Sequence, residues 1–275
     1  MRNHSILIIG AGSLGTALIE QLIPSHYNSI RVLDSSEHAL YEAKNHFSSP
    51  KLRLLLGDVR DADRLNMAMA DIGDVILCAA VKSIDIALAN PMETVSVNVF
   101  GTFAVIREAY HSKPKRVLVL SSDKGVLGHG MGVYHASKYI VEAVTRWANF
   151  HSSHTRFSCV RPANFVPSDM SFTETWFRAY REGKEIPVTG SEVTRYFIPI
   201  DKAADYTLRA LRAMQGGEIF VPPAHKENML SLAKRLKRPI KIIGLRPNDR
   251  LSEELLSPEE KKQARKVSGM WVIKG

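Results

Sequence analysis

The chain has 275 residues, of which 45% are hydrophobic and 24% charged, a composition typical of an ordinary globular domain. The formal net charge is +9, but the positive residues are dispersed and no nucleic-acid-binding motif accompanies them, so we expect a phosphorylated small molecule and no nucleic acid as partner. No apolar run approaches the roughly 20 residues that cross a bilayer, and no signal-peptide pattern opens the chain, so a cytoplasmic protein without a membrane partner is expected.

The first predicted elements are a strand, a glycine turn and a helix. The apolar run 5–9 predicts the strand, and a helix over about 13–22 follows a GxGxxG motif, Gly10-Ala11-Gly12-Ser13-Leu14-Gly15. Without β-carbons the first two glycines let the backbone turn sharply and approach a pyrophosphate, while the third allows close packing of the helix. The helix amino terminus also favours negative charge. We therefore predict a dinucleotide site made by Gly10, Gly12, Ser13, Leu14 and Gly15.

The second predicted strand, 30–33, ends at an acidic residue. Asp34 lies nineteen residues after Gly15, where a carboxylate would accept a hydrogen bond from a ribose 2′-hydroxyl. This position favours NAD, with NADP as a possible alternative. Asp34 fits a helix N-cap as well, because Ser35, Ser36 and Glu37 follow it and carboxylates suit helix starts.

Two further predicted strands, 52–56 and 74–77, end in small or polar residues. Asp58 and Val59 follow the first strand and either border the adenine or form an ordinary strand-end turn. The second strand is followed by Ala79, Ala80 and Lys82, which we expect at the crevice where open α/β sheets bind ligands.

A long amphipathic helix is predicted over 91–111. Asn90 is expected as its N-cap and Pro91 as its first residue. Asn98 lies one position off the apolar seam of this helix, and it is either solvated or part of a site.

The next predicted strand, 116–120, leads into the densest group of reactive side chains. Ser122, Asp123 and Lys124 follow this strand, and Tyr134 and Lys138 come after a glycine-rich loop. At this spacing Lys138 lies one helical turn beyond Tyr134, so a cation stands beside a phenol whose ordinary pKa is about 10. We expect the cation to favour the phenolate and to make Tyr134 a base near neutrality, in redox chemistry on a hydroxyl. The alternatives are an ordinary helix surface for the Tyr/Lys pair and a surface ion pair for Asp123 and Lys124.

Strands alternate with helical patterns through residue 160, which predicts an α/β protein with a doubly wound, parallel Rossmann sheet. The pattern loosens after a strand over 157–160, and a small C-terminal substrate-binding lobe is expected. We assign 1–163 and about 193–215 to the dinucleotide-binding domain, and about 164–192 and 216–275 to the lobe. Cys78 and Cys159 fall at or inside buried strands and are interpreted as inert thiols, with no metal site.

The later part of the chain has weaker patterns. A helix is predicted over 173–181, a strand over 218–221, a helix over about 226–236 and a strand over 240–243. The tail from 257 onward is either a loosely docked helix or an interface strand.

With these segments in place, the chain resembles an extended short-chain dehydrogenase/reductase, and within that group the UDP-N-acetylhexosamine 4,6-dehydratases of polysaccharide biosynthesis. The resemblance covers about residues 5 to 256. Its most specific pieces are Ala79-Ala80-Val81-Lys82, Asn90-Pro91-Met92-Glu93-Thr94, Asn98-Val99-Phe100-Gly101-Thr102, Ser122-Asp123-Lys124, Thr194-Arg195-Tyr196-Phe197, and Gly244-Leu245-Arg246-Pro247 with Glu253-Glu254-Leu255.

The resemblance implies a mechanism. Tyr134, with Lys138 behind it, would take the proton of the sugar 4-hydroxyl while hydride leaves C4 for the nicotinamide, and Ser122 would hydrogen-bond the 4-oxygen. Lys124 would then remove the C5 proton, and protonated Asp123 would assist the loss of the 6-hydroxyl as water. The hydride would return to C6, so the cofactor would be regenerated.

The resemblance also implies binding residues. Tyr134, Lys138 and Asn98 join the cofactor group, since the corresponding helix of such enzymes carries an Asn that helps to order the catalytic Lys. Lys82 is expected at both cofactor and substrate. The UDP would contact Asn164, Arg195, Arg246 and Glu253.

Two further functions stay open. One is a C4 epimerase or ketoreductase of the same fold acting on a UDP-sugar, which would keep the fold but not the elimination. The resemblance favours the dehydratase over this function, because epimerases usually lack an Asp-Lys pair. The other is a dinucleotide-sensing regulator without turnover. The loop between Asp123 and Tyr134 is about two residues longer than is usual in the family and lacks its Asn-Pro. A homo-oligomer is expected.

Overall fold

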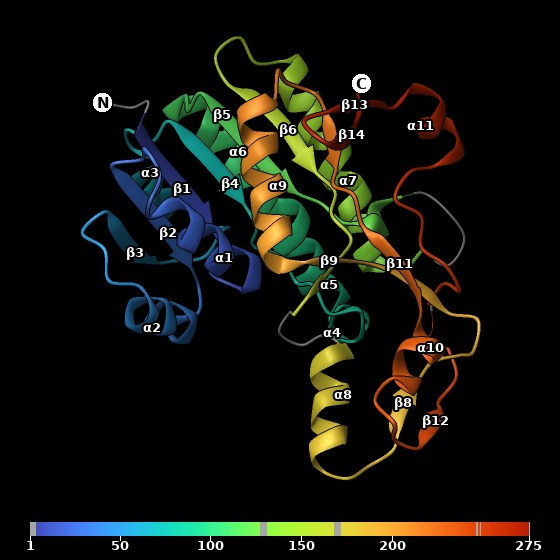
Figure 1. Cartoon of the computed structure of the whole chain (residues 1–275). Coiled ribbons are helices and arrows are strands. Elements are labelled where there is room, and N and C mark those ends of the chain that lie inside the picture. The colour runs from blue at the N-terminus through green and yellow to red at the C-terminus, as the bar shows by residue number, and fades with distance from the viewer. Residues whose placement is uncertain (1–3, 127–130, 168–171, 246, 248, 275) are drawn as a thin grey trace.

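The computed structural model describes residues 4–126, 131–167, 172–245, 247 and 249–274, with the backbone alone for 172 and 173. A nine-stranded sheet forms its centre (Figure 1), in the order β13-β14-β10-β6-β5-β4-β1-β2-β3. The seven strands from β10 to β3 run parallel, and β14 and β13 complete the edge in antiparallel pairings. These strands are β1 (Ser5–Ile9), β2 (Ser29–Asp34), β3 (Leu52–Leu56), β4 (Asp74–Leu77), β5 (Arg116–Leu120), β6 (Arg156–Val160), β10 (Ile219–Val221), β13 (Arg265–Val267) and β14 (Met270–Ile273).

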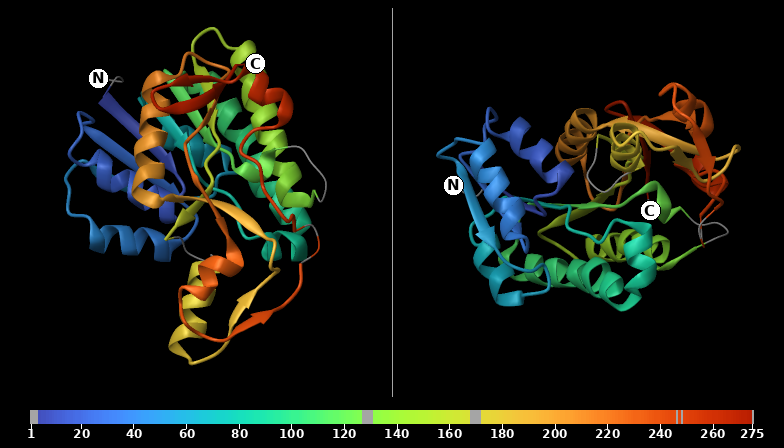
Figure 2. Two further views of the ribbon diagram at one scale, coloured as in Figure 1. Left: turned by 45° about the vertical axis from the view of Figure 1, so that its right-hand side comes forward. Right: turned by 90° about the horizontal axis from the view of Figure 1, so that it is seen from below.

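Helices cover both faces of this sheet, so the predicted doubly wound fold is confirmed. One face packs α1 (Ser13–Leu22), α2 (Glu37–His46) and α9 (Ile200–Ala213) over a core that includes Ile8, Leu18 and Leu211. The other face packs α3 (Ala62–Met69), α6 (Gly101–Ser112) and α7 (Val133–Phe150) over a second core. In the right-hand view of Figure 2 the orange helix α9 and the green helices lie on opposite sides of the sheet. Strands buried on both faces need continuous apolar runs, and β1 and β4 have them over residues 6–9 and 75–77.

A smaller unit projects from the carboxyl ends of the strands (Figure 1). It contains a three-stranded sheet, β11-β9-β7, and a two-stranded sheet, β12-β8. Its own core gathers Trp176, Ile186, Val193 and Met229. The elements are β7 (Asn164–Val166), α8 (Phe172–Arg181), β8 (Ile186–Val188), β9 (Thr194–Pro199), β11 (His225–Asn228), α10 (Met229–Lys234) and β12 (Ile240–Ile242).

The structure departs from several predicted elements. The long helix is divided into α5 (Pro91–Val95), a π-helical turn over Ser96–Phe100, and α6. Asn90 does not cap it with its side chain, because that amide donates to the Ile86 carbonyl at the end of α4 (Ile84–Ala89), a helix the sequence reading missed. Helix α9 was missed too.

The C-terminal part also differs from its prediction. The first residues of the helix expected over 226–236 belong instead to β11, which pairs with β9. After α11 (Pro258–Gln263) the tail forms the hairpin of β13 and β14. Both β10 and β14 lie in the main sheet, although the sequence placed residues 216–275 in the lobe. No helix among the described residues combines the length and apolar composition needed to span a bilayer.

Candidate active site

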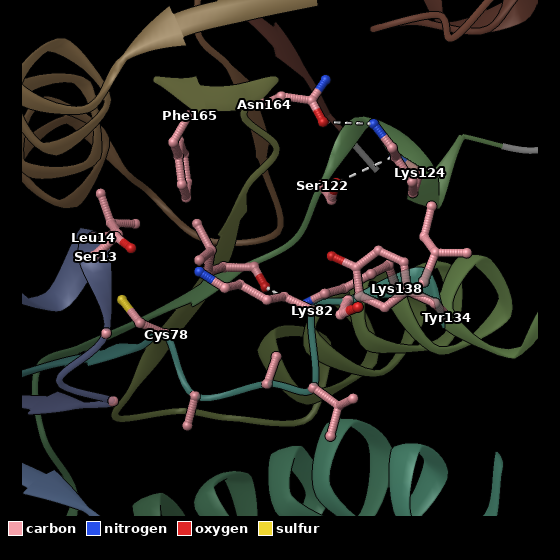
Figure 3. Close-up of a pocket in the computed structure, with 18 of the residues that line it drawn as sticks. Ser13, Leu14, Cys78, Lys82, Ser122, Lys124, Tyr134, Lys138, Asn164 and Phe165 are labelled. Atoms are coloured by element: carbon pink, nitrogen blue, oxygen red, sulfur yellow. Dashed lines mark hydrogen bonds between the residues drawn. The ribbon is translucent and has the colours of Figure 1, made fainter. Parts of the chain in front are cut away.

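A large cavity lies where the carboxyl ends of the parallel strands meet the smaller unit. Its volume is about 840 Å³, and its wall includes residues of β1, β2, β4 and β5 ends on one side and of β7, α8, β8 and β9 on the other. Figure 3 shows Ser13 and Leu14 at one end, with Ser122, Lys124 and Tyr134 at the other. The glycine turn and the reactive side chains Ser122, Lys124 and Tyr134 therefore line the same continuous cavity.

The glycine turn has the geometry that a pyrophosphate requires. Gly10 has φ of +109°, and a β-carbon there would lie 2.6 Å from the Ala79 nitrogen, so no larger residue fits. Gly12 has an ordinary φ and faces open space, because no atom of the described part of the chain lies within 4 Å of where its β-carbon would be. A β-carbon on Gly15 would collide with the Gly10 carbonyl. The turn thus packs tightly against the backbone at Gly10 and Gly15 and leaves open space at Gly12. All three predicted glycines, Ser13 and Leu14 line the cavity.

Asp34 sits at the end of β2 beside this turn. Its Oδ2 accepts from the Ala11 backbone nitrogen at 2.6 Å, and its Oδ1 accepts from the Ser36 nitrogen at 2.7 Å. The N-cap of α2 is Ser36 rather than Asp34, so the capping alternative is wrong. The carboxylate is held against the glycine turn and lines the cavity.

Asp58 and Val59 also line the cavity, but an arginine that the sequence reading overlooked shares their position. Arg60 binds Asp58 through Nη2 at 2.6 Å and reaches Glu93 at 2.8 Å. The hydrogen bond from Arg60 lowers the pKa of the Asp58 carboxyl. An opposite charge two residues after Asp58 was the only signal available for this pairing.

Ala79, Ala80 and Lys82 lie in the wall after β4 as predicted, whereas Asn98 does not reach it. The Asn98 side chain is buried, accepts from the Val81 nitrogen at 2.8 Å and donates to the Ser137 hydroxyl at 3.0 Å. Ser137 in turn donates to the Tyr134 carbonyl at 2.7 Å. Asn98 therefore ties the loop after β4 to the first turn of α7, and it contacts Ser137 instead of the expected Lys138.

Tyr134 and Lys138 both line the cavity from α7 (Figure 3). The Lys138 ammonium lies 6.0 Å from the centre of the Tyr134 ring and donates to the Leu120 carbonyl at 3.1 Å. Burial lowers the pKa of Lys138 to about 8. The pKa of Tyr134 is raised, first by burial and then by the charge of Asp123, and a hydrogen bond with Ser122 opposes this only in part. The expectation that the neighbouring cation lowers this pKa is therefore wrong for the free protein.

The 3₁₀ turn Asp123–Gly125 holds the second reactive pair. The Lys124 ammonium contacts both oxygens of Asp123 at 3.0 Å, and Ser122 donates to Asp123 Oδ1 at 2.8 Å. Lys124 lines the cavity, while Asp123 lies behind it with 1% of its surface exposed. The pair is buried, which excludes the alternative of a surface ion pair.

The residues expected at the UDP divide into three groups. Arg195 and Asn164 line the cavity. Glu253 is 1% exposed and lies outside its wall, where Arg250 contacts it at 3.4 Å and burial raises the pKa of its carboxyl. Arg246 lies outside the described residues, as does part of the glycine-rich loop before Tyr134.

His135 is a further buried polar group that the sequence reading did not single out. Its Nδ1 accepts from the Gly132 nitrogen at 3.3 Å, while its Nε2 has no hydrogen-bond partner among the residues that the structure describes. Burial is the main cause that lowers its pKa to about 4, so the imidazole is neutral at pH 7.

The parallel Rossmann sheet, the glycine turn and the Tyr134/Lys138 pair on one cavity wall define an extended short-chain dehydrogenase/reductase. The family model described as "Polysaccharide biosynthesis protein" matches residues 6–275, and the chain belongs to that family.

Similar proteins include both dehydratases and epimerases. The chain is 33% identical to a UDP-N-acetylglucosamine 4,6-dehydratase (inverting) of Campylobacter jejuni, over 94% of this chain and 79% of the relative. It is 32% identical to an uncharacterised membrane protein of Methanocaldococcus jannaschii, over 99% of this chain and 86% of that relative. It is 30% identical to a UDP-glucose 4-epimerase of Rickettsia rickettsii, over 93% of this chain and 78% of that relative. The crystal structure of Pen from Bacillus thuringiensis superposes with a TM-score of 0.95 at 28% identity, covering 100% of this chain and 89% of that one.

Proposed function

We propose that the protein is an NAD-dependent UDP-N-acetylhexosamine 4,6-dehydratase that makes a 4-keto-6-deoxy sugar nucleotide for surface glycan synthesis. The observation that carries this proposal is the position of Lys124. Its ammonium is bonded to Asp123 and lines the same cavity as Tyr134, so one bound sugar can meet an oxidation site and an elimination site. The similarity to a UDP-N-acetylglucosamine 4,6-dehydratase supports the same reading.

NAD is the dinucleotide that the glycine turn and Asp34 fit. The open space in front of Gly12 would take the pyrophosphate, and the Asp34 carboxylate would face the adenosine ribose, where a 2′-phosphate would be repelled. Ala79, Ala80 and Lys82 would border the rest of the cofactor. The nicotinamide supplies one function, which is to accept hydride from C4 and to return it to C6.

The chain's own residues would move the protons. Tyr134, as a phenolate stabilised by the Lys138 cation, takes the proton of the 4-hydroxyl, and Ser122 is bonded to the same oxygen. The 4-ketone acidifies C5, and Lys124 as the neutral amine removes the C5 proton. Protonated Asp123 then gives its proton to the departing 6-hydroxyl, which leaves as water while the C5–C6 double bond forms.

This elimination leaves Lys124 as a cation and Asp123 as an anion, which is the ion pair seen in the structure. When hydride returns to C6, Lys124 returns a proton to C5. Exchange with solvent then removes the 4-hydroxyl proton from Tyr134 and restores the proton of Asp123 before the next turnover. Arg195 and Arg246 would hold the UDP diphosphate, and Lys82 would contact the sugar nucleotide as well as the cofactor.

The direct test is to incubate the purified holoenzyme with UDP-N-acetylglucosamine and to analyse the product by mass spectrometry. We expect loss of one water without added reductant, and one deuterium at C5 when the reaction runs in deuterated water. Lys124→Met should retain bound cofactor and form no dehydrated product. Failure of the unaltered enzyme with every UDP-N-acetylhexosamine would contradict the proposal.

A C4 epimerase is the second candidate, favoured by the similarity to a UDP-glucose 4-epimerase. Epimerisation needs hydride transfer at C4 and the Tyr134/Lys138 pair, but it has no use for an acid and a base at C6 and C5. A product that keeps its 6-hydroxyl and differs from the substrate only at C4 would select this function.

We also infer that the enzyme works as a cytoplasmic homo-oligomer. Helix α7 carries an apolar stripe, defined here as Ile140, Trp147 and Phe150, and these side chains are 39%, 53% and 85% exposed. Phe100, in the π-helical turn before α6, and Phe103, on α6, are exposed as well. Apolar side chains gathered on adjacent helices are typical of a surface covered by a second copy.

A further inference from the structure

The side-chain amide of Asn164 was expected to contact UDP, but its hydrogen bonds are made to other residues of the protein. Asn164 opens β7, and its side-chain oxygen accepts from the Lys124 ammonium at 3.0 Å. Its side-chain nitrogen donates to the Tyr196 carbonyl on β9 at 2.8 Å. Figure 3 shows the amide and the ammonium facing one another across the cavity wall. Both ends of the amide are thus engaged by the protein itself.

The contacts of Lys124 explain why this amide matters. An ammonium has three N–H donors and no acceptor, and Lys124 has three oxygen partners at 3.0 Å, two from Asp123 and one from Asn164. The side chain is 6% exposed, so water supplies little of its hydrogen bonding. Asn164 is the uncharged partner of Lys124. It lies on β7, whereas Asp123 lies in the same 3₁₀ turn as Lys124.

We propose that Asn164 is a positioning residue for Lys124, which fixes the place of the amine and sets how readily it gives up a proton. The inference rests on the proposed function, because Lys124 is there the base at C5. It replaces the expectation that Asn164 serves mainly to bind UDP.

The orientation of the amide follows from its second contact. The Tyr196 carbonyl can only accept a hydrogen bond, so it holds the NH₂ group of Asn164 and turns the amide oxygen toward Lys124. That oxygen has no proton to give, so an N–H of Lys124 must point at it in both the charged and the neutral state. The lone pair of the neutral amine is therefore directed away from Asn164, toward Asp123 and the cavity.

The same bond joins the two parts of the molecule at the reactive group. Lys124 follows β5 of the main sheet, whereas Asn164 and Tyr196 belong to the three-stranded sheet β11-β9-β7. A shift of β7 or β9 would move the amide oxygen and thereby the Lys124 nitrogen. The C5 base is thus placed by both parts of the cavity wall.

The test measures Lys124 itself in the full-length protein with its bound cofactor. Acetic anhydride labels neutral amines, so mass spectrometry across a pH series gives the labelling midpoint of Lys124. Asn164→Ala removes an acceptor from the ammonium and should lower this midpoint by about one pH unit, whereas Asn164→Asp adds a negative charge and should raise it. Opposite shifts from two substitutions at one site would not arise from a merely structural role.

The matched control is Asn228→Ala. Asn228 also bridges two segments through its amide, donating to the Ser191 carbonyl and accepting from the Ser231 nitrogen, and it lies outside the cavity wall. This variant should leave the labelling midpoint of Lys124 unchanged. A midpoint that moves as much in Asn228→Ala as in Asn164→Ala would overturn the inference.

Turnover gives the second measurement. Asn164→Ala should reduce kcat and the rate of deuterium exchange at C5 by about tenfold or more, while the Kd for UDP changes less than about threefold. A large loss of UDP affinity with unchanged kcat would make Asn164 a UDP ligand and overturn the inference. If the unaltered enzyme dehydrates no sugar, the proposed function fails, and the labelling midpoints still decide whether Asn164 controls Lys124.

Discussion

Lys138 carries its ammonium into the protein interior, and this placement has a cost for folding. Burial holds the pKa of Lys138 at about 8, below the value of about 10.4 that an exposed lysine has. Below pH 8 the amine is charged in both the folded and the unfolded chain, so the full penalty of burying the charge is present. Between about pH 8 and 10.4 the folded protein has released the proton and the unfolded chain has not, so this penalty declines.

Replacing Lys138 by Met should therefore stabilise the protein while abolishing activity. At pH 7 we expect the free energy of unfolding to rise by roughly 2–3 kcal/mol, and the gain should shrink toward zero near pH 10. Urea denaturation of both proteins at the two pH values measures this. A gain that does not depend on pH, or a loss at pH 7, would show that the buried charge is not the cause.

Both proposed activities, the dehydratase and the epimerase, use Tyr134 as the proton acceptor. Tyr134→Phe removes only the phenol oxygen and should reduce turnover by about 10²–10⁴-fold, because general base catalysis contributes that much. Tyr110→Phe is the matched control, since the Tyr110 hydroxyl donates to the Ala148 carbonyl and lies away from the cavity. Product formation is measured under single-turnover conditions. Unchanged turnover in Tyr134→Phe would contradict this role for Tyr134, and an unchanged phenotype of cells that carry the variant would favour a regulator that senses the dinucleotide.

At the scale of the elements, the turn between β1 and α1 contains two glycines with different roles. We expect Gly10 to be needed for folding and Gly12 for binding of the dinucleotide. Gly12→Ala places a methyl group in open space at an ordinary φ, so stability should stay within about 0.5 kcal/mol, yet that methyl group enters the space proposed for the pyrophosphate. We expect NAD affinity to fall at least about tenfold, a loss near 1.4 kcal/mol, by calorimetry.

The neighbouring substitution provides the contrast. Gly10→Ala forces a β-carbon to within 2.6 Å of the Ala79 nitrogen at a φ of +109°, and it should lower the thermal midpoint of the protein. If Gly12→Ala destabilised the protein as much as Gly10→Ala, the open space in front of the turn would be ruled out.

This turn also illustrates which elements could be predicted from the sequence. The glycines, the strand before them and the helix after them are neighbours in the chain, so a local pattern was sufficient, and the predicted bounds of β1 and α1 agree with the structure. The Tyr134/Lys138 spacing within α7 is local in the same way.

Contacts between distant segments were beyond such patterns. Asn98 meets Ser137, and Lys124 meets Asn164, across 39 and 40 positions of the chain. The π-helical turn that contains Asn98 has no sequence signature of its own, and the burial of Glu253 depends on how the segment around Arg250 packs. The prediction that Tyr134 is made acidic by its neighbour failed for a related reason, because burial and the charge of Asp123 raise the pKa of its phenol.

At the scale of the whole molecule, the apolar stripe of α7 gives the proposed assembly a specific test. Trp147→Glu places a charge in the middle of the stripe and should convert the oligomer into monomers, as measured by light scattering during size-exclusion chromatography. Phe177→Glu is the control, because Phe177 is 59% exposed but lies on α8 of the smaller unit. Dissociation by Phe177→Glu with Trp147→Glu still assembled would place the interface elsewhere.

The antiparallel strand β14 has a consequence for biosynthesis. It covers the outer edge of β10, yet the ribosome makes β10 first and then β11, α10, β12, α11 and β13 before it reaches Met270. During that interval the backbone groups along the edge of β10 lack their final neighbour, and such an edge can recruit a strand from another nascent chain. A messenger that stalls translation shortly before Met270 would therefore yield a sheet prone to coaggregation, although the glycine turn and the reactive side chains had already been made.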